Sequence, residues 1–167
     1  VGLLIPWGTN SRVGGQAYKP FAKDCICFPM KNKVNQITGL YFRSTINDTD
    51  QKHFYLKEST GLYPKYPEPE TAKLILTEAI IDAATLLQIP DIQKDYTILS
   101  AYGTNRLTEE HIQAIKELKH LKEIVFAFDN DEAGNKAVEK YSQELKTILP
   151  EVKLTRIELE EGEDINS

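Results

Sequence analysis

The feature that most constrains the fold is an apolar run that ends abruptly at two aspartates. Residues 124–128 are continuously apolar and favour β structure, as in a strand that is covered on both faces. Such strands belong to parallel sheets with helices on each side, so this segment predicts an α/β fold. Asp129 and Asp131 follow at the carboxyl end of the strand. Because side chains two apart in an extended segment point the same way, the two carboxylates are expected to converge.

Convergence of two carboxylates is unfavourable by itself. Two unit charges ~4 Å apart repel by ~4 kcal/mol at an effective dielectric constant of about 20. A bound cation or a raised pKa would relieve this repulsion. The alternative is a solvated turn in which Asp131 only caps the helix that follows.

Strand and helix patterns alternate through the second half of the chain. This succession predicts a mostly parallel sheet of flavodoxin-like order, in which the first and third strands lie side by side. The expected strands are residues 73–77, 97–100, 124–128 and 152–159, and the expected helices are residues 78–88, 108–121 and 132–149.

This topology would bring a second pair of acids to the aspartates. Glu78 follows the first strand, and Asp82 lies one helical turn later on the same face. With Asp129 and Asp131, four carboxylates would then face one crevice. Hard oxygen ligands in this number suit Mg²⁺ or Mn²⁺.

The first half of the chain predicts a small strand-rich lobe after an irregular segment over residues 1–23. Its antiparallel strands are expected at residues 25–30, 36–44 and 53–56. Three prolines make residues 61–71 a linker, so we expect two domains, residues 1–71 and 72–167.

Basic and aromatic residues alternate in this lobe. Such a face can track a nucleic-acid backbone and stack bases, although the same pattern also describes a solvated face opposite a core. The lobe carries nine Lys/Arg against six Asp/Glu, whereas residues 72–167 carry eleven against nineteen. A basic lobe beside an acidic one is compatible with phosphate held by the first and metal by the second. The residues that are candidates for binding nucleic acid or nucleotide are Lys31, Lys33, Arg43 and Lys57.

Composition narrows the class of protein. With 41% hydrophobic and 27% charged residues, the chain has the make-up of an ordinary globular protein, and no apolar run is long enough for a membrane span. Cys25 and Cys27 are too few for a structural zinc site and are predicted to be small buried hydrophobes. Reduced thiols predict a cytoplasmic location. We also expect the chain to be a fragment, because it begins with Val and ends after an acidic run.

The acidic motifs resemble a known family. Glu78-x-x-x-Asp82 after an apolar strand, together with FDNDEAG around Asp129 and Asp131, is similar to the Toprim signature of DnaG-type primases, topoisomerases and OLD-family nucleases. Other segments also resemble the primase branch. They are residues 28–31, 39–43 and 100–104, and residues 162–164, which are similar to a GKD segment. The chain departs from that branch at Ala79 in place of glycine, at Glu163 in place of lysine, and at residues 54–57, which replace a KYLN-like segment.

The resemblance implies a primase-like catalytic core with a Toprim fold. Metal-dependent nucleotidyl transfer would make short RNA primers on single-stranded DNA from nucleoside triphosphates. Glu78, Asp129 and Asp131 would be catalytic and bind Mg²⁺ or Mn²⁺ with support from Asp82, and Asp164 would lie further out. A replicative helicase would be engaged through domains that this fragment lacks, and zinc would not be bound within it.

Three other classes of protein share some of these features. A Toprim nuclease or topoisomerase-like protein would cleave DNA, but no pattern marks a catalytic tyrosine. A non-catalytic nucleic-acid-binding scaffold would retain only a relic metal site. A HAD-type phosphatase is disfavoured, because its DxD follows the first strand and carries Thr or Val where this chain has Ala133.

Overall fold

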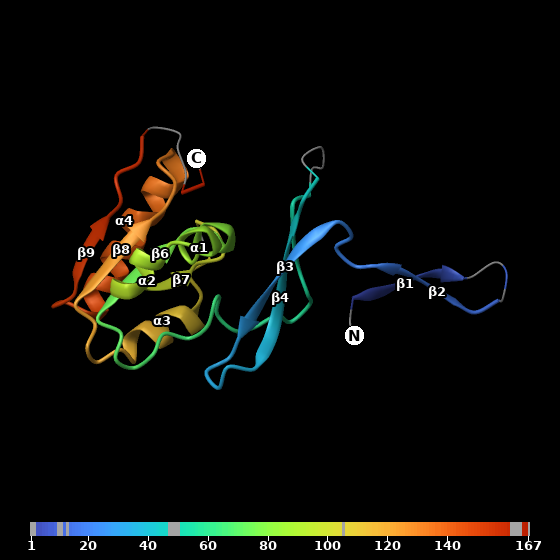
Figure 1. Ribbon diagram of the computed structural model, residues 1–167, viewed down its shortest axis with the longest axis horizontal. Coiled ribbons are helices and arrows are strands. Elements are labelled where there is room, and N and C mark those ends of the chain that lie inside the picture. The colour runs from blue at the N-terminus through green and yellow to red at the C-terminus, as the bar shows by residue number, and fades with distance from the viewer. Residues whose placement is uncertain are drawn as a thin grey trace.

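A four-stranded parallel sheet forms the centre of the C-terminal half (Figure 1). The computed structural model describes residues 3–9, 12, 14–46, 51–104, 106–160 and 165–166. The strand order is β7-β6-β8-β9, so the first and third strands of this half are neighbours, as predicted for a flavodoxin-like order. The strands are β6 (Lys73–Thr77), β7 (Thr97–Ser100), β8 (Glu123–Ala127) and β9 (Lys153–Arg156).

Helices cover both faces of this sheet, which explains why its strands are apolar on both sides. Leu76 of β6 belongs to a core shared with α3 (Glu109–Lys116) and α4 (Glu132–Ile148). Ile75, the adjacent residue of β6, belongs to a second core with α1 (Ile80–Leu86). Alternate side chains of one strand therefore contribute to two separate cores.

Two predicted helices have different bounds in the structure, and one further helix was not predicted. The first helix begins at Ile80 and not at residue 78, because Asp82 Oδ2 accepts a hydrogen bond from the Ala79 backbone N–H (2.8 Å) and so fixes the helix start. The helix α2 (Pro90–Asp95) was not predicted, although its proline occupies the first turn, where no N–H is needed. The third helix ends at Lys116, five residues earlier than expected.

The N-terminal lobe contains the predicted antiparallel sheet, in the order β3-β4-β5. A third core cluster, which includes Met30, Tyr41 and Ile80, joins this sheet to α1. Leu62, within the predicted linker, is fully buried and pairs with Lys31, so the start of that segment is packed against the lobe. The strands are β3 (Cys25–Lys31), β4 (Ile37–Ser44) and β5 (His53–Tyr55).

The expectation that residues 1–23 are irregular is wrong. The strands β1 (Leu4–Thr9) and β2 (Gln16–Pro20) form an antiparallel hairpin that projects from the lobe, away from the parallel sheet (Figure 1). Gly8, Gly14, Gly15 and Pro20 suggested turns, but a two-stranded ribbon has only edge strands, which tolerate proline. Phe21 anchors the base of the hairpin through an edge-to-face contact with Phe42 at a centroid distance of 5.5 Å.

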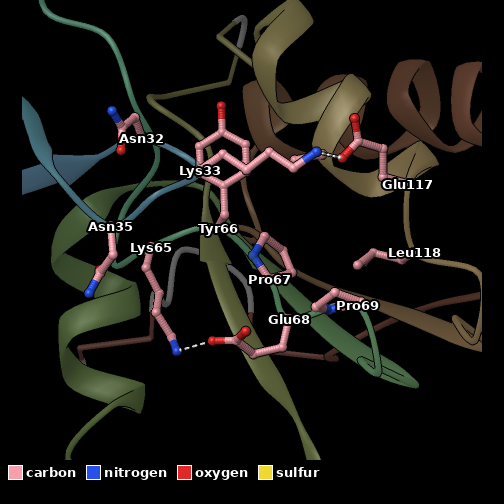
Figure 2. A pocket seen from close by; sticks show the side chains of 11 residues that line it. Asn32, Lys33, Asn35, Lys65, Tyr66, Pro67, Glu68, Pro69, Glu117 and Leu118 are labelled. Carbon is pink, nitrogen blue, oxygen red and sulfur yellow. Dashed lines mark hydrogen bonds and ion pairs between the residues drawn. The ribbon is translucent and has the colours of Figure 1, made fainter.

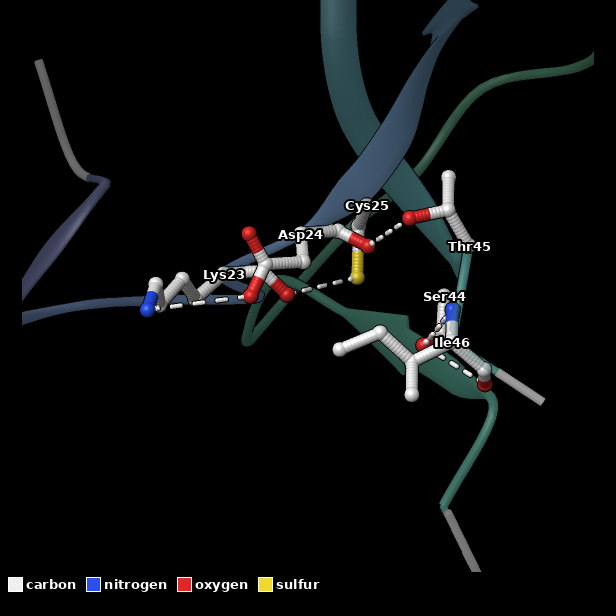
Figure 3. A network of polar contacts seen from close by, with 6 residues as sticks. All are labelled: Lys23, Asp24, Cys25, Ser44, Thr45 and Ile46. Carbon is white, nitrogen blue, oxygen red and sulfur yellow. Dashed lines mark hydrogen bonds and ion pairs between the residues drawn. The ribbon is translucent and has the colours of Figure 1, made fainter. Parts of the chain in front are cut away.

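Hydrogen bonds join the start of β3 to the end of β4 (Figure 3). The Asp24 carbonyl accepts hydrogen bonds from the backbone N–H (2.9 Å) and the hydroxyl (2.8 Å) of Thr45. The Cys25 thiol, which is partly exposed, donates to the Lys23 carbonyl (3.4 Å), and Cys27 is exposed. The prediction of buried cysteines is therefore wrong, because the first half of this edge strand is not covered by a second layer.

Within the part of the chain that the structure describes, no helix is both long enough and apolar enough to cross a membrane.

Candidate metal centre

The candidate site lies where β6 and β8 end side by side. Thr77 and Ala127 are register partners, and the Glu78 backbone N–H donates to the Ala127 carbonyl (3.3 Å). The backbone N–H of Asp129 in turn favours the ionised form of the Glu78 carboxylate and acts to lower its pKa. The parallel pairing therefore brings together two acidic motifs that lie fifty residues apart in the sequence.

Glu78 is in an environment that disfavours its ionised form. Burial, followed by the charges of Asp129, Asp131 and Asp82, raises the pKa of Glu78 to about 7, against the opposing effect of the Asp129 N–H. Among the described residues, the buried Oε2 atom of Glu78 has no hydrogen-bond partner. A buried carboxylate oxygen in a group of four acids is a position that a cation would stabilise.

Asp131 caps α4 and remains exposed at the site. Its Oδ1 accepts a hydrogen bond from the Gly134 backbone N–H (2.7 Å), which is the capping role that the alternative interpretation of the motif expected. Its charge nevertheless acts on Glu78, so capping and proximity to the acidic group occur together. Two open hollows, each of about 600 Å³, adjoin Asp131 on either side of the start of α4.

Asp82 is buried and has two local roles. Its Oδ2 accepts the hydrogen bond from Ala79 that fixes the start of α1, and its Oδ1 accepts one from the Asn166 amide (2.8 Å). Asp82 therefore contributes a negative charge near Glu78 while its side chain holds α1 and the C-terminal segment.

The loop that carries the two aspartates is held by residues that sequence reasoning did not single out. Arg156 of β9 donates hydrogen bonds to the carbonyls of Asp129 (2.9 Å) and Phe128 (3.4 Å) and to the side chain of Asn135. A side chain added at Gly134 would place its Cβ 2.2 Å from the Asp129 carbonyl oxygen. Arg156 had no local signal, because its role depends on β9 lying beside β8.

The loop after β7 also reaches the site. The Gly103 backbone N–H donates to the Glu78 carbonyl (2.9 Å), and Gly103 has a φ of 107°, a conformation that favours glycine. The segment predicted from the primase resemblance at residues 100–104 therefore contacts the first acidic residue. The GKD-like segment at residues 162–164, with Asp164, lies outside the described residues.

The four basic candidates are not gathered in one place. Lys33 extends to the C-terminal end of α3 and forms an ion pair with Glu117 (2.5 Å) beside a pocket of about 430 Å³ (Figure 2). Lys57 is highly exposed and lies 3.8 Å from the Glu58 carboxylate. Lys31 is half-buried at its pairing with Leu62.

Arg43 differs from the lysines in its partners. It lies on the face of β4 that is turned toward α1, because Tyr41, two residues before it, contacts Ile80 and has its pKa raised in part by the charge of Asp82. Of the four basic candidates, Arg43 is therefore the one that shares a strand face with a residue affected by the charge of Asp82.

The acidic group fits a hard divalent cation, although it is not a ready-made cage. Within the described ranges, no three His, Cys, Asp or Glu side chains are arranged as a complete metal site. Mg²⁺ usually retains several waters and uses only one or two protein carboxylates, so such a cage is not required. The Oε2 atom of Glu78, which has no partner in the described part of the chain, and the all-oxygen donor set suit Mg²⁺ or Mn²⁺ better than softer metals.

Comparisons with known proteins agree with this architecture. The DNA primase domain of Pseudomonas aeruginosa has a TM-score of 0.66 and 26% identity, over 99% of this chain and 51% of that chain. The primase catalytic core of E. coli gives 0.68 and 24%, over 99% and 52%. A DnaG primase catalytic domain bound to single-stranded DNA gives 0.67 and 24%, over 99% and 50%.

These matches define both the extent and the limit of the similarity. The chain spans about half the length of the primase structures that it matches. None of the curated proteins matches it in sequence. The model of the Toprim-like family matches residues 75–167, which is more than half of the chain and contains all four acidic residues. The chain therefore belongs to the Toprim-like family, and its fold is that of primase catalytic cores.

Proposed function

We propose that this chain is part of the catalytic core of a DNA primase, in which Glu78, Asp129 and Asp131 bind Mg²⁺ or Mn²⁺ for nucleotidyl transfer. The observation that carries the proposal is that Glu78 lies at the end of β6 beside the end of β8, where one of its buried carboxylate oxygens has no hydrogen-bond partner among the described residues, in a fold shared with primase cores. The substrates would be ribonucleoside triphosphates and a single-stranded DNA template. A replicative helicase would be engaged through other parts of a larger protein.

The chemistry requires positioning and neutralisation of charge. When bound, divalent cations stabilise the attacking 3′-oxygen and the leaving pyrophosphate during phosphoryl transfer. Glu78 and the aspartates would hold the cations, while Asp82 holds α1 in place and adds negative charge. Arg156 and Gly134 keep the backbone of the aspartate loop in one conformation, so the ligands need little reorganisation.

The basic lobe would supply phosphate contacts. Arg43 is the strongest candidate, because it shares a strand face with Tyr41, and the charge of Asp82 is one cause of the raised pKa of Tyr41. Lys31, Lys33 and Lys57 would contribute to binding of the nucleic-acid backbone further from the acidic group. Contacts of this kind depend strongly on salt concentration.

Primer synthesis tests the proposal most broadly. The purified chain is incubated with single-stranded DNA, ribonucleoside triphosphates and Mg²⁺ or Mn²⁺, and the RNA products are resolved by size. Product is expected with the wild-type chain and should be lost in Asp129→Ala. Asp91→Ala serves as the matched control, because it removes an exposed aspartate from α2, outside the acidic group.

The alternatives give different outcomes in the same material. Metal-dependent nicking of supercoiled plasmid without primer synthesis would indicate a DNA-cleaving Toprim protein. Binding of single-stranded DNA with neither activity would indicate a scaffold. Either result would overturn the primase proposal.

A further inference from the structure

Arg43 is held by His53, which is itself held by Tyr41. The Arg43 guanidinium lies 2.7 Å from Nε2 of His53. The Tyr41 hydroxyl lies 2.8 Å from Nδ1 of the same ring. The three side chains form a connected group on one face of the β4–β5 pair, in which Arg43 and His53 are register partners.

The hydrogen bonds fix the protonation state of this group. Arginine can only donate, so Nε2 of His53 must accept, and the ring proton of a neutral His53 is then on Nδ1, directed at the Tyr41 oxygen. Burial and the charges of Arg43 and Lys52 lower the pKa of His53, which favours the neutral ring. Burial, followed by the charge of Tyr55, raises the pKa of Tyr41 to about 12, so its hydroxyl also stays neutral.

Within the described ranges, Arg43 has neutral partners that do not compensate its charge. In the same lobe, Lys33, Lys57 and Lys65 are each paired with a carboxylate. Among the residues that the structure describes, no carboxylate lies within ion-pair distance of Arg43. Its guanidinium is therefore oriented by the protein but keeps its full charge for an external anion.

We propose that Tyr41 and His53 are positioning residues that hold the Arg43 guanidinium ready to bind a phosphate group delivered to the acidic site. The inference rests on the proposed function, since it assigns the phosphate to a nucleotide or a nucleic-acid strand. An arginine loses much side-chain entropy when it binds, and a preoriented one loses less, so the two partners should increase affinity without touching the ligand.

The test measures phosphate binding directly and does not require catalysis. One arm uses a fluorescently labelled single-stranded oligodeoxynucleotide, and the other uses ATP with Mg²⁺. Arg43→Ala should weaken binding of at least one probe by roughly tenfold, and His53→Ala should weaken the same probe by roughly threefold to tenfold. His53→Gln, whose amide oxygen can replace Nε2 as the acceptor, should restore the affinity to within about twofold of wild type.

Positioning differs from direct contact in how the substitutions combine. If His53 acts through Arg43, the double variant Arg43→Ala/His53→Ala should bind no more weakly than Arg43→Ala alone. Tyr41→Phe keeps the buried ring and should show the same dependence on Arg43. Lys57→Ala is the matched control, because it removes a cation outside this group, so its effect should multiply with that of His53→Ala.

Several results would overturn the proposal. Binding of both probes unchanged in Arg43→Ala, no recovery in His53→Gln, or independent effects of Arg43 and His53 would each do so. An effect confined to the oligonucleotide or to ATP supports it and identifies the source of the phosphate. If the variants show this binding pattern but the wild-type chain makes no primers, the result would count against the proposed polymerase activity alone.

Discussion

The Glu78 backbone N–H donates a hydrogen bond to the Ala127 carbonyl (3.3 Å), and this bond joins the ends of two neighbouring parallel strands. Glu78 is thereby held where burial and three other acids act on it, and one of its oxygens is left without a described partner. The acidic group therefore destabilises the metal-free protein, so removing one of its charges should raise the stability of that form.

Glu78→Gln should stabilise the metal-free protein at high pH. The folded-state pKa of Glu78 is raised to about 7, so the stability contributed by its protonated form is fully present below about 4.5 and is lost as pH rises through 7. Glutamine remains neutral and avoids this loss. In EDTA at pH 8, urea unfolding should show Glu78→Gln more stable by about 1 kcal/mol, a value reduced for solvent screening because Glu78 is only half-buried.

At pH 4.5 the two proteins should be about equally stable. A variant that is less stable than wild type at both pH values would contradict the assigned environment of Glu78.

Gly134→Ala should distort the aspartate loop. Its new Cβ would lie 2.2 Å from the Asp129 carbonyl oxygen, a contact that only movement of the backbone can relieve. We expect a loss of about 2–3 kcal/mol in the free energy of unfolding, measured by urea denaturation, together with weaker Mn²⁺ binding. Gly15→Ala is the control, because open space surrounds Gly15, and it should change stability by less than about 0.5 kcal/mol. Equal effects of the two substitutions would show that the close approach at Gly134 is not important.

Arg156→Lys tests the support of the same loop from β9. Lysine keeps the charge but cannot donate to the Asp129 carbonyl and to Asn135 in the same fork, so the free energy of unfolding should fall by about 1–2 kcal/mol. Lys153→Gln, on the same strand, removes an exposed ion pair with Glu123 and should have an effect of less than about 1 kcal/mol. The Mn²⁺ affinity should fall in Arg156→Lys and be unchanged in Lys153→Gln. A loss of affinity in both would indicate a general effect of charge on β9.

His111 should resist protonation. It is fully buried, with Nε2 2.8 Å from the Ser100 carbonyl and Nδ1 2.6 Å from the Thr108 hydroxyl, and burial lowers its pKa to about 4. The stability that the neutral ring contributes is therefore fully present above about pH 6.5 and is lost as pH falls toward 4, by at most about 3 kcal/mol. In NMR spectra the His111 ring signals should not shift between pH 8 and 5.5. A titration of the His111 ring signals with a midpoint near pH 6.5 would contradict this prediction.

The elements with the clearest patterns were those that the sequence predicted correctly. Residues 73–77 and 97–100 match β6 and β7, because strands buried on both faces have distinctive apolar runs. The strand expected over residues 152–159 ends at Arg156, since its apolar alternation continues beyond the sheet pairing. The β1–β2 hairpin was missed, because most of its side chains are exposed and leave no alternation to read.

The candidate site was predictable only in part. Connectivity placed Glu78 beside Asp129, because the order of strands in such folds is restricted. The hydrogen bonds of Asp82 to Ala79 and Asn166, and the pairing of Arg43 with His53, depend on side-chain contacts between distant segments. No periodicity or local motif reports such contacts, so they require the structure.

Binding of Mn²⁺ by Asp131→Asn shows whether the acidic group at the ends of β6 and β8 holds a metal ion. Asparagine can still cap α4, so the substitution removes a charge from the acidic group while it preserves the helix start. Asp91→Asn, at an exposed aspartate in the first turn of α2, is the control. Free Mn²⁺ is measured by EPR during titration of each protein. We expect the Mn²⁺ affinity to be at least about tenfold weaker in Asp131→Asn and unchanged in Asp91→Asn. Equal affinity in wild type and Asp131→Asn would contradict a metal site at this end of the sheet.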